Sequence, residues 1–370
     1  MWTLTDNKDW AAVRRSFSWV RDMEGVPQDP VHHAEGDVAV HTRLVLEALE
    51  TLPEYRLLGA QERETLWAAA LLHDVEKRST TVIEPDGRVT AQGHARKGAL
   101  TARSLLYLDQ PAPFALREAV VNLVRYHGLP LWAIDKPDPA KAVIGACLVA
   151  DTRLLSLLAR ADALGRQCAD REDLLYRIGL FDALCQEHDC WGRPYAFATP
   201  HARFQYFRKE EAYPGFVPFD EFGSTVVLMS GLPGAGKDTH IARHYRDWPV
   251  VSLDDIRRAM KVSPTDKTGN GHAIQAAKEA ARSYLRAGRN FVWNATNITR
   301  NLRGQLVDLC VTYKAYVRID YVEVPYVELL AQNAGREAVV PAAAIDRLVQ
   351  RLEVPAPEEA HEVHYFARNA

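Results

Sequence analysis

The stretch Gly231–Lys237 constrains the fold of this chain more than any other feature of its sequence. It reads Gly-Leu-Pro-Gly-Ala-Gly-Lys, follows the apolar run Thr225–Ser230 and opens the helical pattern Lys237–Tyr245. A glycine-rich loop between a strand and a helix can point its backbone N–H groups into one anion-sized concavity. We therefore predict a phosphate-binding loop whose lysine reaches the terminal phosphates.

Strand-like and helical patterns alternate after this loop. Apolar runs lie at Val250–Ser252, Asn290–Trp293 and Tyr316–Val322, and helical patterns lie at His272–Arg286 and Arg300–Val311. Such alternation predicts a parallel sheet with crossover helices. The expected α/β P-loop kinase domain covers residues 223–370.

The loop predicts ATP, or another nucleoside triphosphate, with Mg²⁺ as the cofactor. The expected cofactor-binding residues are Gly231, Gly234, Ala235, Gly236, Lys237, Asp238, Thr239 and Arg336. The Ser or Thr that usually follows the lysine, as a Mg²⁺ ligand, is Asp238 here. The metal could bind this carboxylate directly or through water, or Thr239 could substitute, and the sequence leaves these alternatives open.

Charged residues that follow the strands are candidates for the acceptor side of a kinase. Asp254 and Arg257 come just past the second strand, where ligand clefts of α/β proteins lie. A carboxylate placed there is the expected base for a hydroxyl acceptor, although Asp254 could instead cap a helix. The segment that carries Arg336 is typical of a mobile lid over phosphates.

The residues before the loop have a different character, since they are helical almost throughout. Apolar residues recur at three- and four-residue intervals in Val38–Glu50, Glu62–Leu72, His94–Leu108 and Pro113–Tyr126. We predict an all-α domain over residues 1–195, interrupted by a turn at Glu84–Gly87. Residues 196–222, rich in Pro and aromatic residues, are expected to form an interdomain connector that packs across the junction.

Imidazoles and carboxylates are spread over the helical half in an unusual order. They are His41, His73, Asp74, His94, His127 and Asp162. The adjacent pair His73-Asp74 closes an alanine-rich helix, where burial is costly unless a cation satisfies both groups. Such ligands suit two divalent transition metals (Mn, Co, Ni, Fe or Zn) better than Ca²⁺.

This order of residues resembles the HD superfamily of metal-dependent phosphohydrolases. The resemblance implies a first metal on His41, His73, Asp74 and Asp162, and a second on His94 and His127 with Asp74 as the bridge. The stretches 33–41 and 160–166 are similar to the HD domain of some bacterial tRNA nucleotidyltransferases, which implies RNA phosphate ends. Lys77, Lys97 and Arg166 are candidate phosphate ligands, and His33 is either a substrate-facing acid or a neighbour of a helix cap.

The second half resembles the 5′-hydroxyl polynucleotide kinase branch of P-loop phosphotransferases. By this resemblance Lys237 holds the ATP phosphates and Asp254 is the general base. Arg257 then grips the acceptor-side phosphate, and Arg336 covers the donor phosphates. The family's phage enzyme has a second lid arginine where this chain has Gln332.

Nearly the whole chain is therefore similar to bacterial HD-Pnk end-healing proteins. That resemblance implies removal of a 2′,3′-cyclic phosphate or 2′-phosphate from RNA ends and phosphorylation of 5′-hydroxyl ends of RNA or DNA. The product ends are those that a downstream ligase requires. Two alternatives stay open: an HD nucleotidase coupled to a kinase for a small nucleoside or metabolite, and an ATP-gated HD switch that senses a nucleotide.

The length and composition of the chain indicate its number of domains and its cellular compartment and exclude some classes of binding partner. The chain has 370 residues, which predicts two or three domains, and its net charge of −3 excludes a globally basic nucleic-acid coat. No apolar run approaches the roughly 18 residues of a membrane span, and residues 1–6 lack the features of an export signal. Five cysteines suit a reducing compartment. We expect a cytoplasmic protein without a membrane partner.

Overall fold

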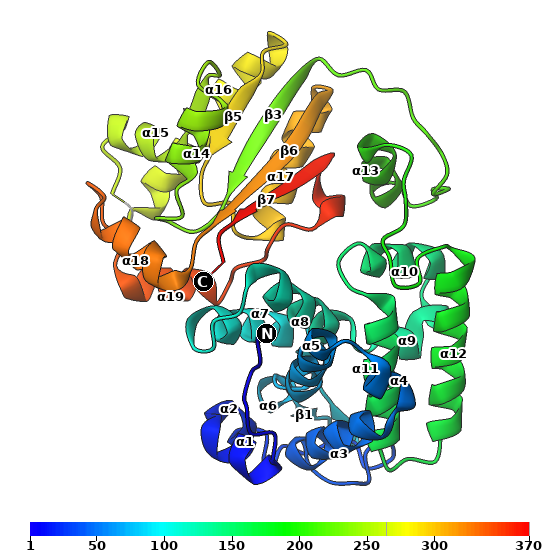
Figure 1. The fold of residues 1–370 in the computed structure, drawn as a ribbon. Helices are drawn as coiled ribbons and strands as arrows, with labels where there is room; N and C mark the ends of the chain where they lie inside the picture. Colours follow the sequence, from blue (N-terminus) through cyan, green and yellow to red (C-terminus); the bar gives the residue numbers. More distant parts are fainter. Residues whose placement is uncertain (264, 370) are drawn as a thin grey trace. The chain divides into compact units, whose positions relative to one another are not determined.

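The structure is a computed structural model that describes residues 1–263 and 265–369. It divides into two compact units, Met1–Ala196 and Phe197–Ala370 (Figure 1). Each unit is described by itself.

The first unit is built from helices, with one small hairpin. The helices are α1 (Trp10–Ser16), α2 (Ser18–Arg21), α3 (Val38–Thr51), α4 (Pro53–Leu57), α5 (Ala60–Leu72), α6 (Lys77–Thr80), α7 (His94–Leu108), α8 (Phe114–Tyr126), α9 (Leu129–Trp132), α10 (Pro139–Cys147), α11 (Thr152–Gly165) and α12 (Arg171–Glu187), with a 3₁₀ turn at Ala133–Asp135. The antiparallel hairpin pairs β1 (Val82–Ile83) with β2 (Val89–Thr90). Both the predicted helical domain and the predicted turn are confirmed.

Helix α5 forms the centre of this unit. Residues 65–72 are all buried, and α5 packs against α3, α8 and α11. A helix that is apolar on every side is stable only when neighbours surround it. Because its last residues are followed directly by His73 and Asp74, the packing of α5 fixes these two polar side chains in the interior, where both are buried.

A glycine sets the approach of α11 to α3. A Cβ atom on Gly165 would lie 2.8 Å from the backbone N of Val45, which is closer than real Cβ atoms come. Asp162 lies one turn before this contact on α11, and His41 lies one turn before it on α3. The close crossing therefore brings the two side chains together.

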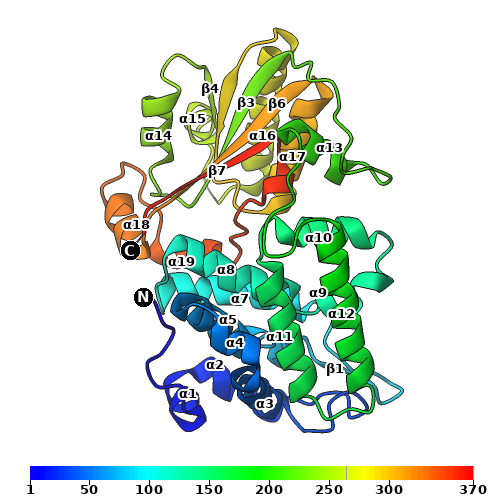
Figure 2. The same cartoon turned by 45° about the vertical axis from the view of Figure 1, so that its right-hand side comes forward.

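The second unit is a parallel α/β structure (Figure 2). Its elements are α13 (Pro200–Arg208), β3 (Ser224–Ser230), α14 (Lys237–His244), β4 (Val250–Ser252), α15 (Leu253–Ala259), α16 (Lys267–Arg286), β5 (Phe291–Asn294), α17 (Arg300–Thr312), β6 (Ala315–Glu323), α18 (Tyr326–Ala334), α19 (Ala342–Val349) and β7 (Glu362–Ala367), with a 3₁₀ turn at Pro357–Glu359. The strand order is β4-β5-β3-β6-β7, with every neighbouring pair parallel. The predicted parallel sheet is confirmed, and β3, which leads into the glycine-rich loop, is its central strand.

The segment expected to be an irregular connector contains a helix. Helix α13 is capped by Thr199, whose hydroxyl accepts from the backbone N–H of Ala202, and it places Phe204 in the core of the second unit. Arg203 donates to the carbonyl of His361 at 2.6 Å. A Thr followed by Pro is a helix-start signal, so the sequence held the evidence for this helix.

Across residues 1–263 and 265–369, no single helix has both the length and the apolar character needed to cross a membrane. The bent pair α10 and α11 meets the length and composition criteria only when the two helices are taken together.

Candidate metal centre and phosphate-binding loop

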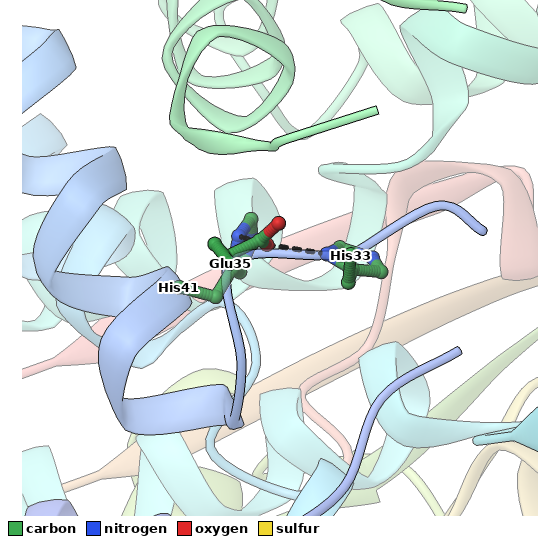
Figure 3. Close-up of side chains that lie close together, drawn as sticks. All are labelled: His33, Glu35 and His41. Atoms are coloured by element: carbon green, nitrogen blue, oxygen red, sulfur yellow. Dashed lines mark hydrogen bonds and ion pairs between the residues drawn. The ribbon is translucent and has the colours of Figure 1, made fainter. Parts of the chain in front are cut away.

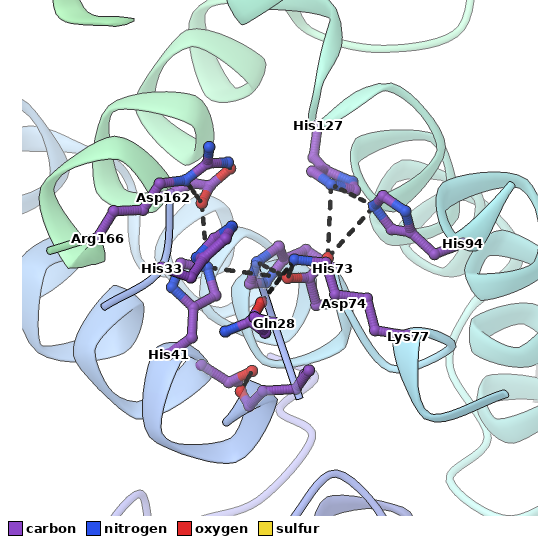
Figure 4. A network of polar contacts seen from close by, with 12 residues as sticks. Gln28, His33, His41, His73, Asp74, Lys77, His94, His127, Asp162 and Arg166 are labelled. Carbon is purple, nitrogen blue, oxygen red and sulfur yellow. Dashed lines mark hydrogen bonds and ion pairs between the residues drawn. The ribbon is translucent and has the colours of Figure 1, made fainter. Parts of the chain in front are cut away.

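The structure gathers the predicted ligands of the helical half at one place (Figure 4). They come from α3, α11, the beginning of α7 and the positions just past α5 and α8: His41, His73, Asp74, His94, His127 and Asp162. All are buried except His94, which is partly exposed. Residues separated by up to 121 positions in the sequence thus meet in one polar cluster inside an apolar core.

Asp74 lies between two sets of imidazoles. Its Oδ2 is 3.3 Å from Nε2 of His73 and 3.8 Å from Nε2 of His41. Its Oδ1 is 3.3 Å from Nε2 of His94 and 3.8 Å from Nε2 of His127. Potential ligand atoms within 4.8 Å of one another form one set on His41, His73 and Asp162 and another on Asp74, His94 and His127. One carboxylate therefore presents one oxygen to each set.

Three of these imidazoles are held in one tautomer. His73, His94 and His127 each place Nδ1 at 2.7–2.8 Å from the carbonyl oxygen three residues earlier, on Ala70, Ala91 and Val124. Because a carbonyl can only accept, each ring donates its Nδ1–H, which leaves Nε2 as the nitrogen available to a metal. The three Nε2 atoms face Asp74, as metal ligation by Nε2 requires.

Neighbouring cations keep both buried carboxylates ionised. Burial by itself would raise the pKa of Asp74, but Lys77, with Nζ 2.7 Å from Oδ2, and His73 hold that pKa well below its usual value. Burial likewise opposes ionisation of Asp162, and Arg166, which donates to both its oxygens at 3.0 and 2.7 Å, outweighs it and lowers the pKa.

The pKa values of the imidazoles shift in different directions. Burial opposes the charged form of His73, but the charge of Asp74 outweighs it and raises the pKa of this ring, whose Nε2 proton a metal would replace. Burial lowers the pKa of His127 to about 3, so this ring is neutral at pH 7 and able to ligate a metal. Burial also lowers the pKa of His33 to about 4, although Glu35 acts against the shift. His33 is therefore neutral near pH 7 and donates its Nδ1–H to Glu35 at 2.8 Å. It lies in the loop before α3, whose N-cap is Asp37.

The cluster fits divalent metal ions by its chemistry. Among residues 1–263 and 265–369, Nε2 of His73 and Oδ1 of Asp74 are buried without a hydrogen-bond partner. Leaving buried polar atoms unpaired costs roughly 1–3 kcal/mol each, and a cation in each of the two ligand sets would remove that cost. Neutral imidazoles and ionised carboxylates are the ligands that transition metals favour.

The candidate phosphate ligands lie in different surroundings. Lys77 is part of the centre, because its Nζ lies 2.7 Å from Oδ2 of Asp74. It also donates to Oε1 of Gln28 at 2.8 Å. Arg166 is held on Asp162. Lys97 lies outside this network, with a side chain 52% exposed that bonds to Ser79 and Glu76.

In the second unit the glycine-rich loop has the backbone geometry that a phosphate cradle needs. Gly231, Gly234 and Gly236 have φ values of 144°, 85° and 93°, which favour glycine. A Cβ at Gly231 would lie 2.3 Å from the carbonyl oxygen of Val322, so the loop can pass β6 only with glycine there. Ala235 is buried within the loop.

Lys237 begins α14 and turns back over the loop. Its Nζ donates to the carbonyls of Gly231 and Leu232 at 2.9 and 2.8 Å. Burial lowers the pKa of this lysine to about 8, and the charges of Asp254 and Arg336 lie close enough to act on it. The predicted acceptor and lid residues therefore lie near the loop.

The acceptor-side residues form a chain of polar contacts. Arg257 donates through Nη1 to Asp254 at 2.9 Å and through Nε to Oδ1 of Asn270 at 2.7 Å. Nη2 of Arg336 lies 3.9 Å from Oδ2 of Asp254. The N-cap of α15 is Ser252, so the alternative that Asp254 caps this helix is wrong. Asn270 was not predicted, because its link to Arg257 depends on how α16 packs beside α15.

Two further predicted residues lie at the mouth of the loop. Asp238 accepts a hydrogen bond from Nδ2 of Asn294 at 2.6 Å, which links the start of α14 to the end of β5. Thr239 follows on the exposed face of α14. Asn297, by contrast, is buried and donates to the carbonyl of Met229 at 2.8 Å, so it supports the end of β3 instead of facing a ligand.

Comparisons with known proteins agree with this division. Residues 38–175 match the family model of the HD domain, and residues 226–355 match that of an AAA domain. The chain is 36% identical over 125 residues to a multifunctional CCA protein of Methylococcus capsulatus, covering 33% of this chain and 26% of that protein. It is 30% identical over 197 residues to the multifunctional CCA protein of Aromatoleum aromaticum, covering 53% and 40%. The chain thus spans well under half the length of these relatives.

Solved structures similar to the chain include two kinases. A putative kinase from Chloroflexus aurantiacus aligns with a TM-score of 0.33 and 16% identity, covering 39% of this chain and 88% of that one. A gluconokinase from Sinorhizobium meliloti aligns with a TM-score of 0.29 and 15% identity, covering 40% and 84%. By its family matches and its fold, the chain joins an N-terminal helical HD domain to a C-terminal P-loop α/β domain that has a five-stranded parallel sheet and matches the AAA domain model.

Proposed function

We propose that this protein is a bifunctional end-healing enzyme for nucleic acids. Its HD domain removes a 2′,3′-cyclic phosphate or 2′-phosphate from RNA ends, and its P-loop domain phosphorylates 5′-hydroxyl ends with ATP. The observation that carries the proposal is the position of Asp74, which faces two separate ligand sets. This is the arrangement expected of a two-metal phosphoesterase.

The side chains of the HD centre divide the work of hydrolysis. His41, His73 and Asp162 would hold one metal, His94 and His127 the other, with Asp74 shared between them. When bound, such a pair supplies a hydroxide near neutral pH and screens phosphate charge. Lys77 and Arg166 hold the two carboxylates ionised and place positive charge where an anionic phosphate enters.

The residues of the kinase domain have matching roles. Glycine N–H groups and Lys237 would hold the donor phosphates, and Asp238 or Thr239 would hold Mg²⁺. Asp254 takes the proton of the attacking 5′-hydroxyl; its side chain is 67% exposed, which leaves it open to an acceptor. Arg257 binds a phosphate of the acceptor strand, and Arg336 neutralises the donor phosphates.

Polynucleotide ends are favoured over small acceptors by two observations. The relatives found by sequence are named multifunctional CCA proteins, and the HD motifs resemble those attached to tRNA nucleotidyltransferases. Arg257 is fixed at two of its nitrogens beside Asp254, which suits recognition of a phosphate next to the reacting hydroxyl. RNA or DNA ends are thus the proposed partners, and a ligase would use the products.

One oligonucleotide that carries a 5′-hydroxyl and a 2′,3′-cyclic phosphate tests both activities. We expect Asp74→Asn to abolish loss of the terminal phosphate and to leave 5′ labelling intact, and Lys237→Ala to do the opposite. Loss of both reactions in either folded variant would contradict two independent sites. Labelling of a mononucleoside as efficient as that of the oligonucleotide would favour the small-molecule kinase instead.

A further inference from the structure

A buried carboxylate outside the predicted ligand set, that of Glu35, contacts both His33 and His41 (Figure 3). The side chain of Glu35, in the loop before α3, has 0% of its area exposed. Its Oε1 lies 2.8 Å from Nδ1 of His41 and 2.8 Å from Nδ1 of His33. Its Oε2 accepts from the backbone N–H of Gln167 at 2.8 Å. Both oxygens are therefore used inside the protein.

The contact with His41 makes up for an acceptor that the helix cannot supply. The other three imidazoles of the centre donate to a carbonyl three residues earlier, at a helix end or start. His41 lies within α3, and the corresponding carbonyl, on Val38, already accepts from the Thr42 hydroxyl at 2.8 Å. The carboxylate of Glu35, in the preceding loop, instead approaches Nδ1 of His41 to 2.8 Å as an ion-pair partner.

The same residue ties the loop to the helix that carries Asp162. Gln167 follows the end of α11, and its carbonyl accepts from the N–H of Ala34 at 3.0 Å. With the contact from Gln167 to Glu35, two hydrogen bonds join the loop to this end of α11. Nε2 of His41 and Oδ1 of Asp162 are 3.1 Å apart. Glu35 contacts His41 directly and contacts the end of the helix that carries Asp162 through the backbone of Gln167.

We infer that Glu35 is a positioning residue of the metal centre. Its carboxylate accepts the Nδ1–H of His41, directs Nε2 toward Asp162 and strengthens this ring as a ligand. The inference rests on the proposed two-metal HD centre and concerns the ion held by His41, His73 and Asp162. A carboxylate behind a ligating histidine typically contributes 10- to 100-fold in metal affinity.

The alternative is that Glu35 is itself a ligand. His33, Glu35 and His41 each offer one ligand atom within 4.8 Å of the other two and could in principle hold a third ion. A neutral imidazole has only one ring nitrogen with an available lone pair. If a metal lies between Nε2 of His41 and the carboxylates of Asp162 and Asp74, the lone pair is on Nε2, and Nδ1 then carries the proton that faces Glu35.

The test is a Mn²⁺ titration of the full chain, with bound metal measured after equilibrium dialysis and its coupling followed by electron paramagnetic resonance. We expect two spin-coupled ions in the wild type. In Glu35→Gln, one ion should bind 10- to 100-fold more weakly and the other within about twofold, so that an uncoupled Mn²⁺ signal appears. Unchanged binding, equal loss of both ions, or a third ion in the wild type would overturn the inference.

Glu76→Gln is the matched control. Glu76 is a buried carboxylate two positions after Asp74, but it bonds to Ser79 and Thr101 and to no histidine of the centre. It should keep both ions. If Glu35→Gln fails to fold, as judged by circular dichroism and thermal unfolding, Glu35→Asp provides the test, because the shorter side chain withdraws the same oxygen.

The metal titration tests the role of Glu35 in metal binding independently of the proposed activity on RNA ends. Two coupled ions in a wild type that hydrolyses no RNA end would contradict the end-healing activity and leave the role of Glu35 measurable. Fewer than two ions in the wild type would contradict both.

Discussion

Lys77 is the residue whose replacement should separate metal binding from catalysis. Its ammonium group lies 2.7 Å from Oδ2 of Asp74, and the two side chains are 11% and 2% exposed. A metal ion on this oxygen has to compete with the ammonium group. Lys77→Met removes the competitor and keeps most of the apolar stem.

The structure sets the size of the effect. At an effective dielectric constant of about 20, two unit charges 2.7 Å apart attract by about 6 kcal/mol before desolvation is subtracted. Hydrogen bonds to charged groups contribute about 1.5–3 kcal/mol net, which is the part that a metal must displace. We therefore expect Lys77→Met to bind Mn²⁺ about 10- to 100-fold more tightly.

Hydrolysis should move in the opposite direction. Without Lys77 the phosphate loses a nearby cation, and the rate of terminal phosphate removal should fall by about 100-fold. Metal affinity is measured by titration calorimetry at pH 8, where Asp74 stays ionised, and hydrolysis by release of phosphate or opening of the cyclic end. Lys97→Met, at an exposed lysine outside the centre, is the control. Weaker metal binding, or unchanged hydrolysis, in Lys77→Met would refute the reasoning.

Three further predictions follow from particular contacts. Gly165→Ala should lower the unfolding free energy by about 1–3 kcal/mol through overpacking against Val45 and should weaken metal binding, which thermal unfolding with and without Mn²⁺ checks. Because ATP favours the charged form of Lys237, whose pKa is about 8, ATP affinity should be constant below pH 8 and fall up to tenfold per pH unit above it; affinity that stays flat to pH 9.5 would contradict this. Asn270→Ala should raise KM for a 5′-hydroxyl oligonucleotide about tenfold with little change in kcat, because it frees the Arg257 guanidinium that binds the acceptor; a change in kcat alone would contradict that role.

Much of the fold could be predicted from local pattern. Helix α7 has the predicted bounds His94–Leu108, and α3, α5 and α8 differ from their predicted bounds by no more than two residues at either end. The loop Gly231–Lys237 could be located because a strand, three glycines and a helix lie in a fixed order. These features depend on residues close together in the sequence.

What escaped prediction depends on contacts between distant residues. Helix α13 was missed although Thr199 and Pro200 signal its start, because its aromatic residues show no clear helical period; of these, Phe204 packs in the core of the second unit. Strand β7 pairs with β6, although α18 and α19 separate the two strands in the sequence. Glu35 has no local signature, since its role depends on the packing of its loop against α11 and on His41 lying within a helix.

The metal centre could be predicted only in part, because its geometry also depends on contacts between distant residues. The order of imidazoles and carboxylates indicated a shared cluster, and the structure places all six side chains together. Their division into two sets around Asp74 depends on which oxygen faces which ring, and the sequence carries no direct record of that orientation.

We propose that Asp74 bridges two metal ions in the HD domain. Anomalous scattering from crystals of the Mn²⁺-loaded protein would locate these ions. We predict two peaks, one among His41, His73 and Asp162 and one beside His94 and His127, with the Asp74 carboxylate between them. A single peak, or peaks that do not contact Asp74, would contradict it.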